Sequence, residues 1–214
     1  VVFSALGLVI TDEQHRFGVK QRQALESKGK SPHVLIMTAT PIPRTMALSV
    51  YGDLDVSFIK GMPPGRHPVK TYVVGSHMLQ RIFRFMKKEM ESGHQAYVVC
   101  PLVEQSEKQD LAAAVSVYEN LRDHVFPQFG VGLVHGRMKN AEKEQVMEDF
   151  RKGKFKLLVA TSVIEVGVNV PDATVMFVYG ADRFGLSQLH QLRGRVGRGK
   201  EQAYCVLYTD NQNE

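Results

Sequence analysis

The chain has 214 residues, of which 43% are apolar and 23% are charged, and its formal net charge is +5. This length and apolar content allow one large core or two small ones, and no stretch resembles a signal peptide or a membrane span. The basic charge favours an anionic partner without specifying nucleic acid. Cys100 and Cys205 lie in apolar runs without metal-ligand spacing, which predicts buried, reduced thiols rather than a disulfide framework.

Apolar runs alternate with helical patterns along the chain, which is typical of an open α/β sheet flanked by helices. The run at 6–10 reads as a buried strand that ends in carboxylates. The expected strands cover residues 6–10, 34–37, 56–59, 69–74, 96–100, 131–134, 157–160, 174–178 and 203–208.

Helices are expected at 19–28, 77–92, 111–124 and 141–152. The second of these carries one apolar stripe, which predicts packing against the sheet. We expect the last to begin after Asn140 as N-cap and to stop at Gly153. The stripe consists of Leu79, Ile82, Phe83, Met86 and Met90.

The stretch 61–68 has three prolines and two glycines, which cannot continue a helix or a central strand. We therefore expect a linker at 63–68, between a partial domain at 1–62 and a complete α/β domain at 69–214. The chain begins at Val1, directly in the approach to a strand, so we expect it to be the cut end of something longer.

The stretch 24–31, Ala-Leu-Glu-Ser-Lys-Gly-Lys-Ser, ends like a phosphate-binding P-loop. A P-loop follows a strand and opens a helix, whereas here a helical pattern precedes Gly29 and an apolar run follows Pro32. We interpret Gly29 as the end of a helix. The true P-loop is then expected upstream of Val1.

Polar side chains follow two expected strands of the first domain. Asp12 and Glu13 come after the strand at 6–10, where adjacent acids can hold Mg²⁺ and orient an attacking water. Thr38 and Thr40 follow the strand at 34–37 and can bond to those acids. The alternatives are a polar loop that caps the next helix and an ordinary Thr-rich turn.

The second domain offers two further groups of polar residues. Thr161 and Ser162 end the strand at 157–160, where hydroxyls suit phosphate contacts. Farther on, Arg195 and Arg198 are three residues apart, which predicts that they share a helical face. Such arginines can neutralise charge on a γ-phosphoryl group, although Arg-Gly runs are also typical of solvated or nucleic-acid-binding surfaces.

The order of these stretches resembles that of the superfamily 2 helicases. Motif II is matched at 12–15, motif III at 38–40, motif V at 161–171 and motif VI at 191–198. A closer resemblance, to a bacterial DNA helicase of branched junctions, covers the whole chain through the stretches 12–18, 38–45, 97–104, 135–139 and 184–199. The resemblance implies a RecA-like parallel sheet flanked by helices, a complete C-terminal helicase domain, preceded by a partial RecA-like domain.

The resemblance also implies roles for single residues. Asp12 would be the Mg²⁺ ligand, and Glu13 would activate water. The implied catalytic set is completed by Gln191, Arg195 and Arg198, and the implied nucleotide-binding set is Gln14, His15, Gly167 and Asn169. The implied DNA contacts are His135, Gly136, Arg137, Thr161 and Ser162, and the residues that couple ATP to movement are Thr38, Thr40, Phe184, Gln188 and His190.

By resemblance the parent protein uses ATP and Mg²⁺ to translocate on double-stranded DNA in fork reversal, branch migration and repair. Branched DNA is the implied partner, with single-stranded DNA-binding protein as a second one, and the implied state is a monomer in the bacterial cytoplasm, away from membranes. The alternatives are a transcription-repair coupling translocase, against which Gln14 and His15 argue, and a non-catalytic DNA-binding module. Lacking a P-loop, these 214 residues alone are expected to be inactive. The stretch 178–182 departs from relatives, which usually have an acid near Tyr179.

Overall fold

The structure is a computed structural model, and it describes residues 3–12, 24, 27–29, 31–38, 55–59, 61, 65–101, 107–161 and 170–210. The chain divides into two compact units, Val1–Ile59 and Lys60–Glu214. No helix in the described ranges is long and apolar enough to cross a membrane.

The first unit contains two parallel strands, β1 (Leu8–Thr11) and β2 (His33–Ile36), with Leu8 opposite His33. Val9 is buried, but Leu8 and Ile10 are 53% and 56% exposed. The prediction of a buried strand here is therefore wrong for one of its faces. The two faces differ because alternate side chains of a strand point in opposite directions and only one set is covered.

The expected strand at 56–59 is also wrong, because residues 55–59 form neither helix nor strand. Phe58 is 52% exposed and Ile59 is 99% exposed, so this apolar run is not part of a core. Three apolar residues in a stretch of four do not specify a strand unless a neighbour pairs with it. The expected helix at 19–28 lies almost wholly outside the described residues.

The P-loop-like stretch is not followed by a helix. Residues 27–29 form a turn, and the next element is β2. A Cβ atom added to Gly29 would lie 2.8 Å from the carbonyl oxygen of Leu6, so this glycine allows a close backbone approach. The interpretation of the match as a false P-loop is confirmed.

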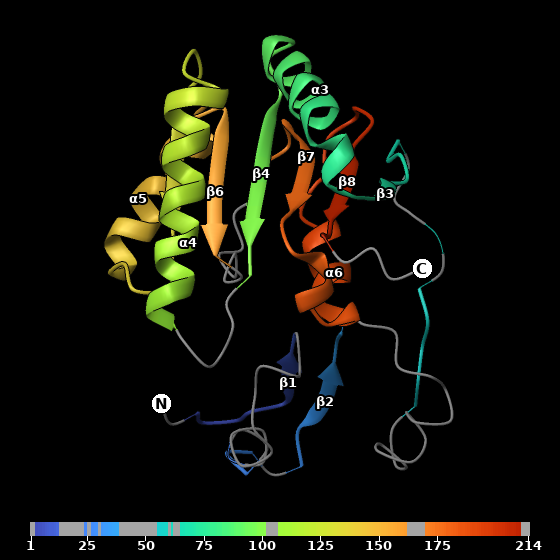
Figure 1. Cartoon of the computed structure of the whole chain (residues 1–214). Coiled ribbons are helices and arrows are strands. Elements are labelled where there is room, and N and C mark those ends of the chain that lie inside the picture. The colour runs from blue at the N-terminus through green and yellow to red at the C-terminus, as the bar shows by residue number, and fades with distance from the viewer. Residues whose placement is uncertain are drawn as a thin grey trace. The chain divides into compact units, whose positions relative to one another are not determined.

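The second unit is built on a six-stranded sheet in the order β3-β8-β7-β4-β6-β5, with every pair parallel (Figure 1). All six strands therefore end at the same edge. The strands are β3 (Lys70–Val74), β4 (Gln95–Cys100), β5 (Val131–Val134), β6 (Leu157–Thr161), β7 (Ala173–Val178) and β8 (Tyr204–Tyr208). The helices are α3 (Leu79–Glu91), α4 (Glu107–Asn120), α5 (Asn140–Arg151) and α6 (Leu186–Arg193).

Helices cover both faces of this sheet. Met86 of α3 and Ala114 of α4 belong to one core cluster, and Phe150 of α5 and Leu192 of α6 belong to the other. Every residue of β4, β6 and β7 is buried. Continuous apolar runs such as 157–160 are typical of strands covered on both faces, which is why the sequence predicts them well.

The predicted α3 stripe is confirmed, since Ile82, Met86 and Met90 are buried. A short 3-10 turn, Ser76–Met78, precedes the helix. The thiols are also as predicted. Cys100 and Cys205 are free and buried, and burial raises the pKa of Cys100 to about 12 and that of Cys205 to about 11.

Two helix boundaries differ from the prediction. The helix α4 begins at Glu107, and after Asn120 the chain continues as a π-helical turn, Leu121–Val125. In α5 the N-cap is Lys139, not Asn140, because the carboxylate of Glu142 accepts a hydrogen bond from the Lys139 amide at 3.1 Å.

Candidate functional site

Asp12 and Thr38 lie at the carboxyl edge of the two strands of the first unit. Thr11 pairs with Ile36, and the Met37 amide donates to the Thr11 carbonyl at 2.8 Å. Asp12 follows Thr11 directly, and Thr38 follows Met37, so the register brings both predicted residues to one edge. Glu13, Gln14, His15 and Thr40 lie outside the described residues.

A metal site in the described residues can draw on only one predicted carboxylate, that of Asp12. Across the described ranges there is no group of three or more His, Cys, Asp or Glu side chains that could hold a metal ion. One exposed carboxylate fits Mg²⁺, which keeps several waters and takes its remaining ligands from substrate phosphates. The residues present therefore fit Mg²⁺ that arrives with a nucleotide.

His135 and Thr161 lie side by side at the ends of β5 and β6. Val134 pairs with Ala160, so the residues that follow them are neighbours. Thr161 is 1% exposed. Its hydroxyl oxygen and the Nδ1 atom of His135 are buried and have no hydrogen-bond partner in the part of the chain that the structure describes. Buried polar atoms without partners are rare, and here two lie on adjacent strands at the edge where ligands bind.

The surroundings of His135 are positively charged. Burial lowers the pKa of its imidazole, and the nearby charges of Lys143 and Arg137 lower it further against the opposing effect of Glu142. The Lys143 ammonium group donates to the Gly136 carbonyl at 2.8 Å, which fixes this cation beside the turn. A neutral imidazole among cations suits an anionic ligand. Ser162, Gly167 and Asn169 lie outside the described residues.

The helix α6 places the remaining predicted residues of the second unit. It begins after Gly185, whose amide donates to the Gln188 side chain at 3.0 Å. Phe184 is buried in the core, and the Nδ1 atom of His190 accepts from Arg193 at 3.0 Å. Gln191 is half-buried on the same helix. Residues 184–193 thus connect the core to the loop that follows α6.

The prediction that Arg195 and Arg198 share a helical face is wrong. The helix ends at Arg193, with Gly194 as its C-cap, and Gly197 has a left-handed φ of 71°. A glycine favours this conformation, which ends helical geometry between the two arginines.

The loop after α6 is held by close contacts. A Cβ atom at Gly197 would lie 3.1 Å from both Ala203 and Val69, and one at Gly199 would lie 2.6 Å from the Pro171 carbonyl oxygen. The Arg66 side chain also donates to the Gly197 carbonyl at 2.8 Å. The loop that carries the two arginines is therefore fixed by packing instead of by helix hydrogen bonds.

Arg195 and Arg198 nevertheless act on the same group. The phenol of Tyr97 is buried in the core, and burial raises its pKa to about 12 against the opposing charges of both arginines. Arg198 is exposed and donates to the Gly194 carbonyl at 3.3 Å. Two guanidinium groups therefore lie close enough to one buried phenol to act on it together.

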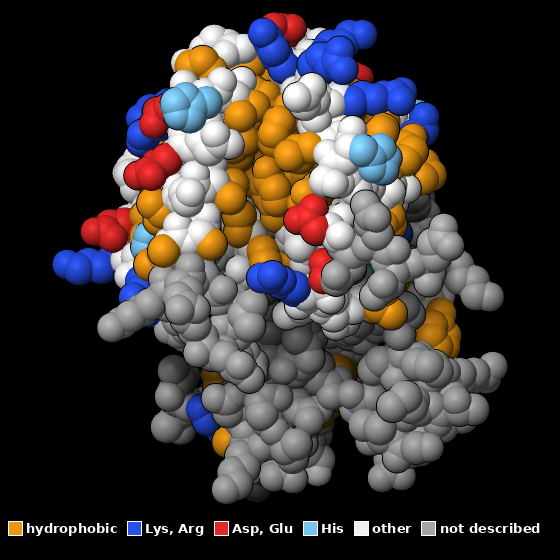
Figure 2. Space-filling view, in the orientation of Figure 1, with side chains coloured by type: hydrophobic (Ala, Val, Ile, Leu, Met, Phe, Trp, Pro, Cys, Tyr) orange, Lys and Arg blue, Asp and Glu red, His pale blue; other side chains and the backbone are white. Residues whose placement is uncertain are grey.

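The unusual stretch after β7 lines a cavity of about 300 Å³ at the carboxyl edge of β4, β7 and β8. Tyr179, Asp182, Arg183 and Asp210 contribute to its lining. Figure 2 shows hydrophobic side chains in the hollow between α3 and α4 on this face. No sequence pattern points to this cavity, because only strand pairing brings residues 179–183 and 210 together.

The fold and the arrangement of strand-end residues define a helicase domain. The chain belongs to the helicase conserved C-terminal domain family, whose model matches residues 76–200. The S. cerevisiae Dbp5 structure bound to RNA and ADP BeF3 has a TM-score of 0.68 and 15% identity over 99% of this chain and 56% of that chain, a likeness of fold alone. The RecA-like parallel sheet expected by resemblance is thereby confirmed.

The closer resemblance is to RecG, as the hallmark stretches predict. The chain is 56% identical to the ATP-dependent DNA helicase RecG of Bacillus subtilis and 53% identical to that of Thermotoga maritima, in both cases over 100% of its length. It spans 31% and 27% of those relatives. A structure of RecG bound to a three-way DNA junction matches with a TM-score of 0.75 and 48% identity over 98% of this chain and 26% of that chain.

Proposed function

We propose that the chain is part of the motor of an ATP-dependent DNA helicase and double-stranded DNA translocase of RecG type. The main observation behind the proposal is that the second unit has two groups of candidate functional residues around one sheet. The buried atoms of His135 and Thr161 that lack a partner in the described ranges lie at its carboxyl edge, and Arg195 and Arg198 follow α6. The identity to RecG over the whole chain supports the same function.

The residues of the chain that would handle ATP come from both units. Bound ATP, with Mg²⁺, supplies the free energy of phosphoryl transfer. Asp12 would hold the metal ion through water, and Glu13 would orient the attacking water. Arg195 and Arg198, with Gln191 before them, would face the phosphates, where a planar guanidinium group neutralises charge that develops on oxygen. Gln14, His15, Gly167 and Asn169 would complete the nucleotide contacts.

His135, Gly136, Arg137, Thr161 and Ser162 would contact the DNA backbone. A phosphate oxygen beside β5 and β6 would accept a hydrogen bond from the Thr161 hydroxyl, which has no partner among the described residues. Contacts of this kind position a protein on a duplex without reading its sequence, which suits a translocase. The cations around His135 would likewise contact phosphate groups without reading the base sequence.

ATP state would reach the DNA site through the strand-end residues and through α6. Thr38 and Thr40 would form hydrogen bonds to Asp12 and Glu13 of the first unit. Phe184 is packed in the core and Gln188 caps α6, so a displacement of this segment would move the helix and the arginine loop. His190, which is hydrogen-bonded to Arg193, would link the helix to the arginine loop.

The domain division at 1–62, 63–68 and 69–214 belongs to this proposal, as do the biological roles. We place the protein in the bacterial cytoplasm as a monomer that reverses stalled forks and migrates branched DNA in recombination and repair. Branched DNA is its substrate, and single-stranded DNA-binding protein is a further partner. The three-way junction in the RecG structure supports the choice of substrate.

The test is ATP hydrolysis by the complete gene product that contains these residues. A three-way DNA junction is expected to stimulate hydrolysis more than a linear duplex of equal length does, because branched DNA is the proposed substrate. The 214 residues alone, which contain no strand–loop–helix phosphate site, are expected to show no hydrolysis. Tight DNA binding by the complete product without any hydrolysis would instead support the non-catalytic DNA-binding module.

A further inference from the structure

The outer face of α3 carries three exposed cations. Arg81, Arg84 and Lys88 are spaced three and four residues apart, which places them on one side of the helix, opposite the buried Met86. The fourth cation of the helix, Lys87, lies 3.9 Å from Glu91. Arg81, Arg84 and Lys88 have no ion pair with any side chain in the described ranges.

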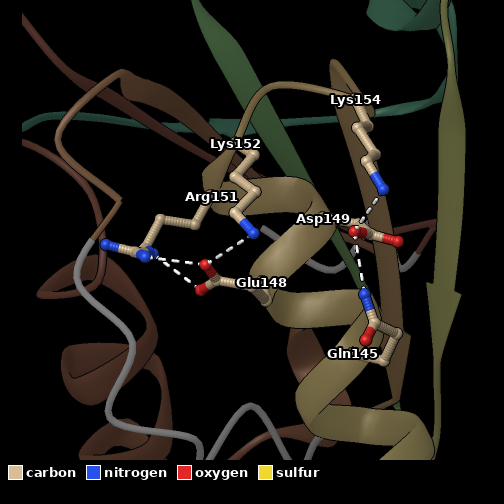
Figure 3. Close-up of polar contacts among 6 residues, drawn as sticks. All are labelled: Gln145, Glu148, Asp149, Arg151, Lys152 and Lys154. Atoms are coloured by element: carbon tan, nitrogen blue, oxygen red, sulfur yellow. Dashed lines mark hydrogen bonds and ion pairs between the residues drawn. The ribbon is translucent and has the colours of Figure 1, made fainter.

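The basic residues around the end of α5 are arranged differently. Arg151 and Lys152 both bind Glu148, at 2.7 and 3.2 Å, and Lys154 binds Asp149 at 2.8 Å (Figure 3). These three cations are paired with carboxylates of α5. Within the described residues, the basic cluster at the end of α5 is therefore ion-paired, whereas the row on α3 is not.

Lys88 lies in the last turn of α3, where the helix dipole favours a cation, but the row as a whole also breaks two local rules. Arg81 lies in the first turn, where the helix dipole favours acids, and that turn contains none. A cation at this position is unfavourable for the helix. Arg84 and Lys88 add a like-charge pair at i,i+4, which is also unfavourable. Residues that break a local rule in this way point to a role outside the helix.

The basic row continues onto the edge strand β3. Phe85 of α3 meets Tyr204 of β8 edge to face, with 4.9 Å between ring centroids, and Lys70 pairs with Tyr204 in the strand register. Val74 packs with the α3 side of the core, so Lys70 and Tyr72 share that face. Lys70 is exposed and Tyr72 is 50% exposed. We call Lys70, Tyr72, Arg81, Arg84 and Lys88 the α3 basic face.

We propose that the α3 basic face binds the phosphate backbone of a DNA duplex. From Arg81 to Lys88 the helix rises about 10 Å, a length over which duplex DNA carries roughly six phosphate charges. The exposed tyrosine adds a flat apolar surface beside the cations. A rigid duplex meets this convex row without loss of chain entropy, whereas an acidic peptide would have to be ordered on it.

The contact would be separate from the one at His135 and Thr161. The strands β3 and β5 are the two edges of the sheet, five strand spacings apart. At ~4.8 Å per spacing the two edges are about 24 Å apart, about seven base-pair steps of duplex DNA. The α3 basic face would therefore contact other phosphates than those beside His135 and Thr161. This inference requires neither ATP hydrolysis nor DNA binding at the first site.

The test measures duplex binding to the 214-residue chain by fluorescence anisotropy, from about 50 to about 200 mM salt. The variant replaces Arg81, Arg84 and Lys88 together by Gln. Each lost phosphate contact reduces the slope of log K against log salt by about 0.9, so we expect the slope to fall by up to about 2.7 and affinity to weaken at least about tenfold.

The matched control replaces Arg151, Lys152 and Lys154 by Gln, which lowers the net charge by the same amount. Because those cations are already paired, this variant is expected to keep the slope of the unsubstituted chain. Circular dichroism checks that both variants fold. Equal losses in the two variants, no loss in the α3 variant, or no duplex binding by the unsubstituted chain would each overturn the proposal. Loss of binding to a poly-glutamate peptide with duplex binding intact would assign the face to a protein partner and also overturn it.

Discussion

Among the described residues, no hydrogen bond offsets the burial of the Thr161 hydroxyl. It is buried at the end of β6 without a partner in the described residues, and an unmade bond of this kind costs about 1–3 kcal/mol. Thr174, at the start of β7, is equally buried but donates to Glu89 at 2.9 Å. Two buried threonines in one sheet therefore have opposite energetic consequences, and only the unpaired one lies at the ligand edge.

Replacement of Thr161 by Val is expected to raise the free energy of unfolding by up to about 1 kcal/mol and to weaken DNA binding. Thr174→Val is the control, and it is expected to lower the free energy of unfolding by about 1 kcal/mol because it removes the hydrogen bond to the Glu89 carboxylate, which keeps its contact with His94 at 3.0 Å. Urea denaturation measures both. Strong destabilisation by Thr161→Val would show that the hydroxyl has a structural partner.

The sequence identifies Thr161 and His135 as candidates, but it cannot make them neighbours. The two residues are separated by a helix, and only the pairing of Val134 with Ala160 places them together. Likewise, sequence spacing suggests a shared helical face for Arg195 and Arg198. The structure instead brings both near Tyr97 through a loop. The residue type indicates which chemistry a side chain can perform. Which residues become neighbours depends on strand register and on turns.

At the scale of elements, the loop after α6 depends on its glycines. The sequence shows them but does not show that Gly197 is left-handed while Gly194 continues helical geometry, with φ of −70°. The helical sequence pattern of residues 186–193 continues into the loop, but the left-handed backbone of Gly197 is incompatible with a helix there. Strands covered on both faces, such as β6, are predicted nearly to the residue because their apolar runs are continuous.

Gly197→Ala is expected to lower the free energy of unfolding by about 1–3 kcal/mol, since alanine is strained at positive φ and its Cβ would lie 3.1 Å from Val69. Gly194→Ala is the matched control. Its backbone is right-handed and its Cβ would meet nothing closer than 3.4 Å, so we expect a change within about 0.5 kcal/mol. Thermal unfolding compares the two, and equal effects would contradict the role given to φ at Gly197.

At the scale of the whole molecule, the sequence predicts an α/β chain of two parts but not the order of its strands. The strand β3 comes first in the second unit, yet it pairs with β8, the last strand of that unit. This pairing places the linker-side residue Arg66 against Gly197, so the start of the unit supports the arginine loop. Parallel pairing over such a separation leaves no local sequence signal.

The central claim is that the second unit supplies guanidinium groups to ATP. The most direct measurement is kcat for junction-stimulated ATP hydrolysis by the complete gene product, compared between Arg198→Ala and Lys200→Ala. An arginine that stabilises the transferred phosphoryl group contributes about 10³-fold or more, so Arg198→Ala should lower kcat by at least that factor while DNA affinity and the Lys200→Ala rate stay unchanged. A loss of less than about tenfold in Arg198→Ala, or an equal loss in Lys200→Ala, would contradict the claim.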